Sequence, residues 1–318
     1  MTEKNVVAIV GATGAQGGGL ARAILDDQSS VFSVRALTRR PASDRAAVLA
    51  SRGATIVEAD LDKPDTLKRA FDGAHTVFCV TNFWEHGSPE RELTQAAAMA
   101  HAAACAGNAH VIWSTLEDTR RWVPLESSRM PTLCGRYKVP HFDAKGEANA
   151  EFTRRNLPAT FLLTSFYWDN YIHFPGMTPR REAGGLALMM PMGDQRLPGI
   201  AAEDIGRCAY GIVRAGDAYV GKTVGIAGEH LTGAEIASAL TRAMGLTVRY
   251  ADLTPDAYRR LDFPGADDLG NMFQFKRDFQ DVFCGARNVE ESRRLNPRLQ
   301  TFEGWLSENG GRIPVREL

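Results

Sequence analysis

Three glycines near the start of the chain have the spacing of a phosphate-binding turn. Gly11, Gly14 and Gly17 follow the apolar run Val6–Val10, whose valines predict a buried parallel strand. Without Cβ atoms, this turn lets backbone N–H groups approach a phosphate at the start of the next helix. The alternative interpretation is a tight turn needed only for packing. The amphipathic stretch after the glycines argues against this alternative, because a dinucleotide-binding turn leads into a helix. We expect a bound dinucleotide, contacted by Gly11, Thr13, Gly14, Ala15, Gln16 and Gly17.

The end of the second expected strand carries two arginines where NAD-binding proteins place an acid. An acid about 20 residues past the glycines would favour NAD by accepting a hydrogen bond from the ribose 2′-hydroxyl. Here Arg39 and Arg40 occupy this place, without a carboxylate. A guanidinium can bind a 2′-phosphate through paired, charge-assisted hydrogen bonds, so we predict NADP(H) over NAD. Further expected contacts are Asp60 and Leu61 at the adenine, and Thr81 and Asn82 near the nicotinamide.

These residues require a sheet whose strands end at one edge, and the first half of the chain predicts it. Strand-like runs alternate with helix-like runs as far as Ala159–Leu163. This alternation predicts an α/β fold, a Rossmann-type doubly wound parallel sheet with right-handed crossovers. We place the NADP-binding domain at residues 1–165. Residues 166–318 are expected to form a smaller C-terminal α+β domain for a substrate or partner, which shares some chain with the first domain.

The stretch 117–140 is long, irregular and stiffened by prolines. It falls between the fifth expected strand and the next helix, at the carboxyl edge where ligands bind to such sheets. Long loops in this position are often lids. We expect either a mobile cover over the cleft or a surface insertion without a function.

Composition argues against several other classes of protein. The 318 residues carry a net charge of −1, so no overall attraction to nucleic acid or to anionic membranes is expected. The five cysteines have neither a CxxC pair nor Cys/His metal spacing, which predicts reduced thiols, no metal site and a cytoplasmic protein. We expect no secretion signal, and no apolar run approaches the ~20 residues of a membrane span. An oligomer is compatible with these features.

Several runs of the chain resemble the NmrA-like family, a branch of the atypical short-chain dehydrogenases/reductases. The resemblance extends over most of the chain and is carried by residues 11–17, 38–41, 80–84, 141–147 and 263–273. It implies a Rossmann-type domain, NADP(H) binding and a C-terminal portion that closes a cleft over the nicotinamide. By position it also implies that residues from Tyr167 to Asn170 contact the cofactor.

The catalytic question concerns one helix. Typical short-chain dehydrogenases use a Tyr-x-x-x-Lys pair, whose tyrosine transfers a proton while the lysine holds the nicotinamide ribose. The resemblance implies that Lys145 is this lysine; the alternative is an exposed lysine of the helix. His141 stands in place of the tyrosine. Imidazole titrates near neutral pH, so His141 is a candidate proton donor; the alternative is a capping or surface residue. Tyr137 is a further candidate, and Ser114 and Thr115 would serve either the substrate or the end of their strand.

Two functions fit these residues. The missing tyrosine favours a redox sensor or regulator that binds NADP(H) without turnover and reports its state through a regulatory protein. The alternative is an NADPH-dependent reductase of a small molecule, an apolar carbonyl, imine or conjugated acceptor. In that case His141, Tyr167 or water would supply the proton. The aromatic run Phe166–Trp168, with Tyr171 and Phe174, would line the substrate pocket or belong to the core. No basic recognition helix for direct DNA binding is visible.

Overall fold

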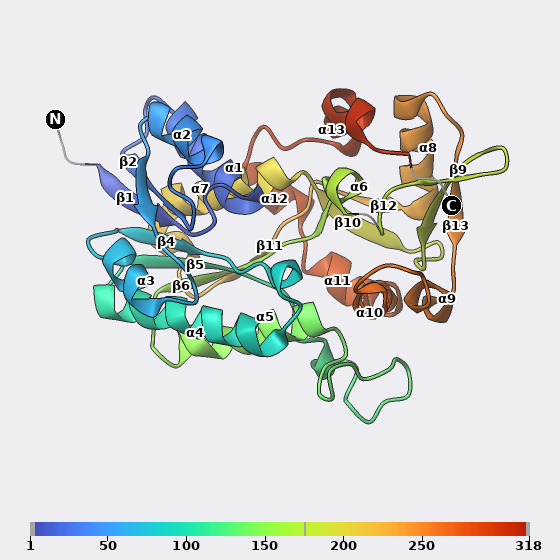
Figure 1. Ribbon diagram of the computed structural model, residues 1–318, viewed down its shortest axis with the longest axis horizontal. Coiled ribbons are helices and arrows are strands. Elements are labelled where there is room, and N and C mark those ends of the chain that lie inside the picture. Colours follow the sequence, from blue (N-terminus) through green and yellow to red (C-terminus); the bar gives the residue numbers. More distant parts are fainter. Residues whose placement is uncertain (1–3, 175, 316–318) are drawn as a thin grey trace.

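Six strands from the first 163 residues and one from the C-terminal half form a parallel sheet of seven strands (Figure 1). The computed structural model describes residues 4–174 and 176–315. The strand order is β11-β6-β5-β4-β1-β2-β3, and each neighbouring pair is parallel. The Rossmann-type fold predicted from the sequence is therefore confirmed. The strands are β1 (Asn5–Ile9), β2 (Phe32–Thr38), β3 (Thr55–Glu58), β4 (Thr76–Cys79), β5 (His110–Thr115), β6 (Ala159–Leu163) and β11 (Thr223–Gly225).

Helices cover both faces of this sheet, as Figure 1 shows. One face packs against α1 (Ala15–Asp26), α2 (Asp44–Ser51) and α7 (Ala202–Ala215). The other face packs against α3 (Pro64–Phe71), α4 (Pro89–Ala106) and α5 (Pro140–Thr153). The composition of the strands explains why helices cover both faces of the sheet. Strands such as β5 are fully buried and consist largely of β-branched and aromatic residues, so both of their faces must be removed from water. Among the helices of the described residues, none is long and apolar enough to span a lipid bilayer.

Glycines allow α1 and α7 to cross in close contact. A Cβ atom on Gly206 would lie 2.1 Å from the backbone nitrogen of Leu20, and one on Gly19 would lie 2.8 Å from the carbonyl oxygen of Glu203. Arg22 of α1 also forms a hydrogen-bonded ion pair with Glu203 of α7. A helix that follows residue 165 in sequence is thus part of the N-terminal layer, as is β11. The domain boundary at residue 165 stays a prediction.

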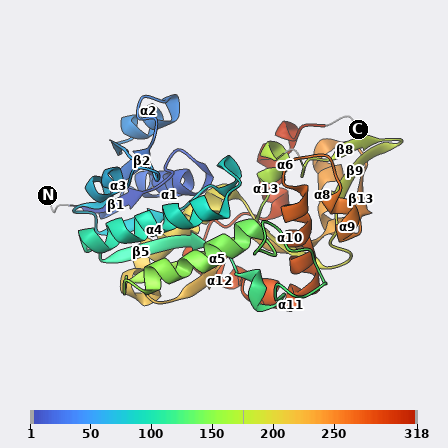
Figure 2. The ribbon, with the colours of Figure 1, turned by 60° about the horizontal axis from the view of Figure 1, so that its bottom comes forward.

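The remainder of the C-terminal half builds a second layer around two small sheets, β12-β10-β7 and β13-β9-β8. Its strands are β7 (Phe166–Tyr167), β8 (Arg180–Glu182), β9 (Gly185–Met190), β10 (Arg196–Ile200), β12 (Glu229–Thr232) and β13 (Val248–Asp252). Its helices are α6 (Asn170–His173), α8 (Gly233–Met244), α9 (Pro255–Arg259), α10 (Ala266–Asp278), α11 (Gln280–Gly285) and α13 (Phe302–Asn309). The helix α12 (Val289–Leu295) instead packs on α7, and its Leu295 belongs to the core of the large sheet. Figure 2 shows α10 standing beside α5, so this layer meets the sheet near the start of α5.

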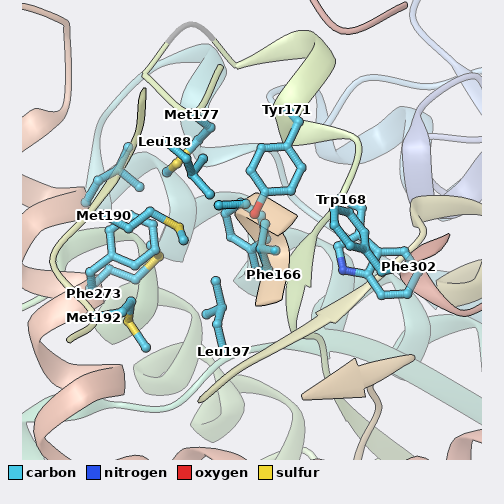
Figure 3. Packing of buried hydrophobic residues seen from close by; sticks show 14 of the residues in the cluster. Phe166, Trp168, Tyr171, Met177, Leu188, Met190, Met192, Leu197, Phe273 and Phe302 are labelled. Carbon is cyan, nitrogen blue, oxygen red and sulfur yellow. The ribbon is translucent and has the colours of Figure 1, made fainter. Parts of the chain in front are cut away.

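The core of the second layer is aromatic and rich in methionine (Figure 3). Trp168 packs against Phe302 with ring centroids 5.3 Å apart, and the Tyr171 ring lies 5.4 Å from Phe166. Phe273 of α10 also packs against Phe166, with ring centroids 6.3 Å apart. These rings hold α10 against β7 and thereby position the α10 side chains discussed below.

The segment 117–140 is anchored to α10. The Asn271 amide donates to the backbone carbonyls of Pro131 (2.9 Å) and Lys138 (2.5 Å), and Gln274 donates to that of Arg129 (2.7 Å). A short 3-10 helix, η2 (Thr119–Arg121), opens the segment. All residues of 117–140 are described, and none of them lines the cavity presented below. The expectation of a cover over the cleft is therefore wrong for this structure, because the segment packs on the flank of α10.

We predict that cofactor leaves hydrogen exchange in this segment unchanged. The backbone N–H groups of Lys138 and Val139 donate to the buried carboxylate of Asp143, at 2.7 and 3.0 Å. Amides with buried partners exchange slowly, because they must first open. Hydrogen exchange followed by mass spectrometry should show protection at 138–139 in the free protein and no further slowing with NADP(H). A marked slowing on cofactor addition would instead restore the lid.

Candidate functional site

A cavity of about 920 Å³ opens at the carboxyl edge of the large sheet, between the sheet and the second layer. Its walls include the segments that directly follow β1, β2, β3, β4 and β6. This is the edge at which parallel α/β sheets bind ligands. The structure brings to this cavity the residues predicted to bind the cofactor and the two candidates on α5: Gly11, Thr13, Gly14, Ala15, Gln16, Gly17, Arg39, Arg40, Asp60, Leu61, Thr81, Asn82, His141, Lys145, Tyr167 and Asn170.

The glycine turn forms a cradle at the start of α1. Gly11 has φ +64°, a left-handed conformation that favours glycine, and its carbonyl accepts from the Gly14 N–H at 2.8 Å. A Cβ on Gly17 would lie 2.6 Å from the same carbonyl oxygen. No side chain caps the helix, so its first N–H groups face the cavity. The geometry fits the pyrophosphate of a dinucleotide.

Gln16 joins this cradle to the second layer. Its amide nitrogen donates to the hydroxyl of Tyr167, which begins the C-terminal half. Its amide oxygen is buried and has no hydrogen-bond partner within residues 4–174 and 176–315. A buried unpaired acceptor at a cavity wall is ready for a ligand donor. Burial also raises the pKa of Tyr167, which makes its hydroxyl a poorer acid than an ordinary tyrosine.

Arg39 lies at the cavity as expected, but it already has a partner. Its guanidinium forms a two-pronged pair with Glu85 at the end of η1 (Phe83–Glu85), with Nη2 2.9 Å from Oε2. This hydrogen bonding holds the pKa of the Glu85 carboxyl below its usual range. Both side chains are substantially exposed, so the pair is weak and can be exchanged. Sequence reasoning missed Glu85, since nothing in the spacing links it to the second strand.

Lys145 is held by a buried network at the end of β4. Its ammonium lies 2.6 Å from a carboxylate oxygen of Glu92 and donates to the Thr81 hydroxyl and carbonyl. Glu92 is fully buried, and its other oxygen lies 3.5 Å from His86 Nε2. The lysine therefore points to the nicotinamide side expected from Thr81. Glu92 was also missed; its only signal was a carboxylate in the first turn of an alanine-rich helix.

His141 forms a buried pair with Asp268, which comes from α10. The ring Nδ1 lies 2.7 Å from Asp268 Oδ1, and the His141 backbone N–H donates to Oδ2 at 3.2 Å. Both side chains are less than a tenth exposed. The carboxylate accepts from Nδ1–H, so Nε2 is the ring nitrogen left without a protein partner among the described residues. His141 is thus neither a surface residue nor a simple cap.

Aromatic rings pack against His141, which itself lines the cavity. Its ring centroid lies 4.9 Å from that of Trp84 and 5.9 Å from that of Phe83. Trp84 also packs edge-on against Phe174 at 5.2 Å. The rings and the burial of both side chains lower the polarity around the pair, which strengthens the electrostatic interaction of the imidazole with Asp268.

The other sequence candidates lie outside the cavity or have structural partners. Tyr137 is buried between the guanidiniums of Arg120 and Arg136. Thr115 donates to Asn149 Oδ1 at 2.7 Å and ends its strand, and Ser114 beside it does not line the cavity. Among the described residues, Tyr167 is therefore the tyrosine whose side chain lines the cavity together with His141, and Tyr137 is not a candidate acid.

The aromatic run after β6 divides between the two roles expected of it. Phe166, Tyr167 and Phe174 line the cavity, whereas Trp168 and Tyr171 belong to the core around Phe302. The two residues of β7 thus both reach the cavity, and the division between cavity and core begins with the residue after the strand, Trp168. Within the described part of the chain, no group of three or more histidine, cysteine, aspartate or glutamate side chains could hold a metal ion.

Comparisons with known proteins place this site in context. The family model described as NmrA-like family matches residues 3–306. The NmrA-like oxidoreductase FrzB of Cladobotryum sp. is 28% identical over 288 residues, which cover 85% of this chain and 83% of FrzB. The negative transcriptional regulator NmrA superposes with a TM-score of 0.77 at 21% identity, covering 96% of this chain and 95% of NmrA. NmrA has been solved in complex with NAD and with NADP.

A reductase has a similar fold. The triphenylmethane reductase of Citrobacter sp., solved with NADP(H), superposes with a TM-score of 0.73 at 17% identity. The superposition covers 96% of this chain and 100% of the reductase. One architecture therefore serves both a regulator and a reductase, and the likeness of structures at this identity shows the fold alone.

Proposed function

Because this chain belongs to the NmrA-like family, we propose that it binds NADP(H) and reduces an apolar carbonyl, imine or conjugated acceptor. The observation that carries the proposal is the His141–Asp268 pair in the wall of the cavity. A sensor needs no oriented acid–base group, whereas a reductase must deliver a proton beside the hydride acceptor. The missing tyrosine favours a sensor from sequence alone, but Asp268, the buried partner that supports His141 as a replacement acid, is not evident from the sequence.

The roles follow from position. NADPH, when bound, would supply the hydride. The glycine turn and the start of α1 would hold the pyrophosphate, and Lys145 with Thr81 would hold the nicotinamide ribose. His141 would donate the Nε2 proton to the oxygen or nitrogen of the acceptor, while Asp268 stabilises the imidazolium and keeps the ring oriented. Tyr167 is the weaker acid, since burial raises its pKa.

NADPH oxidation against quinones, imines and aromatic carbonyls tests the proposal. We expect at least one aromatic acceptor to be reduced at an enzymatic rate, because Phe166, Phe174 and Trp84 give the cavity an aromatic wall. Calorimetry on the same preparation should show NADP(H) binding. A protein that binds NADP(H) tightly but oxidises it with no acceptor of the panel would contradict the reductase.

A sensor is the second candidate, and one observation favours it. Trp84 touches both His141 and Phe174, so η1 bridges the cofactor half and the second layer. The neighbouring Glu85 holds Arg39. A bound 2′-phosphate that took Arg39 from Glu85 would therefore alter a contact between the layers, which is the differential interaction a switch needs. A regulatory protein would be the partner in that case. The cellular compartment stays a prediction.

The preference for NADP rests on Arg39. Arg39→Ala is expected to weaken NADP binding by roughly 1.5–3 kcal/mol, the range for a hydrogen bond to a charged group, with little change for NAD. Glu85→Gln should strengthen NADP binding, because it frees the guanidinium for the phosphate. Calorimetry with both dinucleotides measures the effect, and Arg52→Ala, which removes an exposed arginine paired with Asp26, is the control. Equal affinity of the unmodified protein for NAD and NADP would refute the assignment.

A further inference from the structure

The wall of the cavity contains a lysine that has no anionic partner within residues 4–174 and 176–315. Lys276 of α10 is 2% exposed, and its ammonium has the Met272 sulfur at 3.3 Å as its hydrogen-bond partner. It lies over the rings of four phenylalanines, at 5.0 Å from the centroid of Phe283 and 5.5–5.7 Å from those of Phe142, Phe166 and Phe273. Three of these rings line the cavity with Lys276 itself: Phe142, Phe166 and Phe283.

The acidic groups that the structure describes near Lys276 do not form an ion pair with it. Glu117 forms a two-pronged pair with Arg287, at 2.5 and 2.9 Å. The Cys284 thiol stays neutral, because burial raises its pKa. Burial lowers the pKa of Lys276 to about 7, with a smaller contribution from the Arg287 charge. Near neutral pH the amine therefore exists in both its charged and its neutral form. Among the residues that the structure describes, the Met272 sulfur is the one hydrogen-bond partner of this amine.

A purely structural role does not account for this side chain. A buried amine costs free energy unless it is paired, and a methionine of similar length would fill the same space among the rings. Aromatic faces offset part of the cost of the charge, but they also keep water away from it. An anion that entered here would meet the ammonium in a medium of low dielectric constant, where the pairing is strong.

We propose that Lys276 binds the carboxylate of a flat aromatic ligand, whose ring lies among Phe142, Phe166 and Phe283. The inference deepens the proposed function, on which it rests, by giving the acceptor a class: an aromatic compound that carries a carboxylate. The apolar rings would recognise the aromatic body, and the single amine would select the anion and set its orientation. Lys276 is then a residue that determines specificity, distinct from the proton donor His141.

Binding of naphthoate and of its neutral methyl ester tests this inference. Calorimetry on the NADP-saturated protein should show naphthoate binding about 10- to 100-fold more weakly to Lys276→Met than to the parent protein, as expected for a lost charge-assisted contact. The affinity for methyl naphthoate should be nearly unchanged. Met272→Leu is the matched control, because it removes the sulfur partner of the amine and keeps the amine; it should leave the preference for naphthoate intact.

A second measurement needs no variant. Because naphthoate requires the ammonium form, its affinity for the parent protein should fall about tenfold per pH unit above about pH 7, with proton uptake on binding near neutral pH. The ester should show no such dependence. Equal naphthoate affinity in Lys276→Met and the parent, a flat pH profile, or no binding of naphthoate by the parent would each overturn the inference. The proposed function is tested by separate measurements, namely NADP(H) binding and NADPH oxidation with neutral acceptors. Failure of the proposed function can therefore be distinguished from failure of this inference.

Discussion

Replacement of His141 by glutamine is expected to lower turnover by about 10²- to 10⁴-fold, the scale of general acid catalysis. Glutamine retains an N–H that can reach the Asp268 carboxylate, so the buried acid keeps a partner and the fold is preserved. It has no proton to deliver at neutral pH, however. The affinity for NADP(H) should stay nearly the same, because Lys145 and the glycine turn are untouched.

Steady-state NADPH oxidation and cofactor calorimetry on the same samples measure the two effects. His173→Gln is the matched control, since this histidine of α6 is exposed and does not line the cavity; its turnover should equal that of the parent. Asp268→Asn should lower turnover too, and chiefly through kcat, because the imidazolium loses its counter-charge. Robust turnover in His141→Gln would remove the histidine as acid and leave Tyr167 or water as the proton source.

Glu117→Ala is expected to lower the free energy of unfolding by about 3–5 kcal/mol, because it leaves a buried guanidinium without its counter-charge. Arg287 is completely buried, stacks over the ring of Phe283 and donates to the Thr164 carbonyl at 2.9 Å as well as to Glu117. The pair therefore joins the end of the large sheet to α11. Its loss should also loosen the wall that holds Phe283 at the cavity.

Urea unfolding followed by circular dichroism gives the comparison. The double variant Glu117→Leu with Arg287→Met should recover much of the stability, since two apolar side chains replace both charges. Glu303→Ala is the control for an exposed pair: Glu303 and Arg242 are both more than half exposed, and the change should stay below about 1 kcal/mol. A loss in Glu117→Ala no larger than that in Glu303→Ala would show that Arg287 finds another partner or water.

The sequence by itself was sufficient for the parts of this protein that depend on neighbouring residues. The turn from Gly11 to Gly17 and the alternation of strands and helices predicted the parallel sheet and the place of its cavity. Both follow from local rules, since strand and helix periodicity and the need for glycine in a tight turn act over a few residues. The spacing of His141 and Lys145 on one helix face was readable for the same reason.

Only the tertiary structure decided what these residues touch. Asp268 reaches His141 across 127 positions, Glu85 reaches Arg39 across 46, and Glu117 reaches Arg287 across 170. No periodicity links such pairs. The His141–Asp268 and Arg287–Glu117 pairs form because hydrophobic packing brings buried polar groups together, and burial then requires each to find a partner. Arg39 and Glu85 are exposed and meet because the segments after β2 and β4 end at the same edge of the sheet. The expected lid failed for the same reason: loop length and position suggested a cover, but hydrogen bonds from Asn271 and Gln274 of α10 decided where the loop lies.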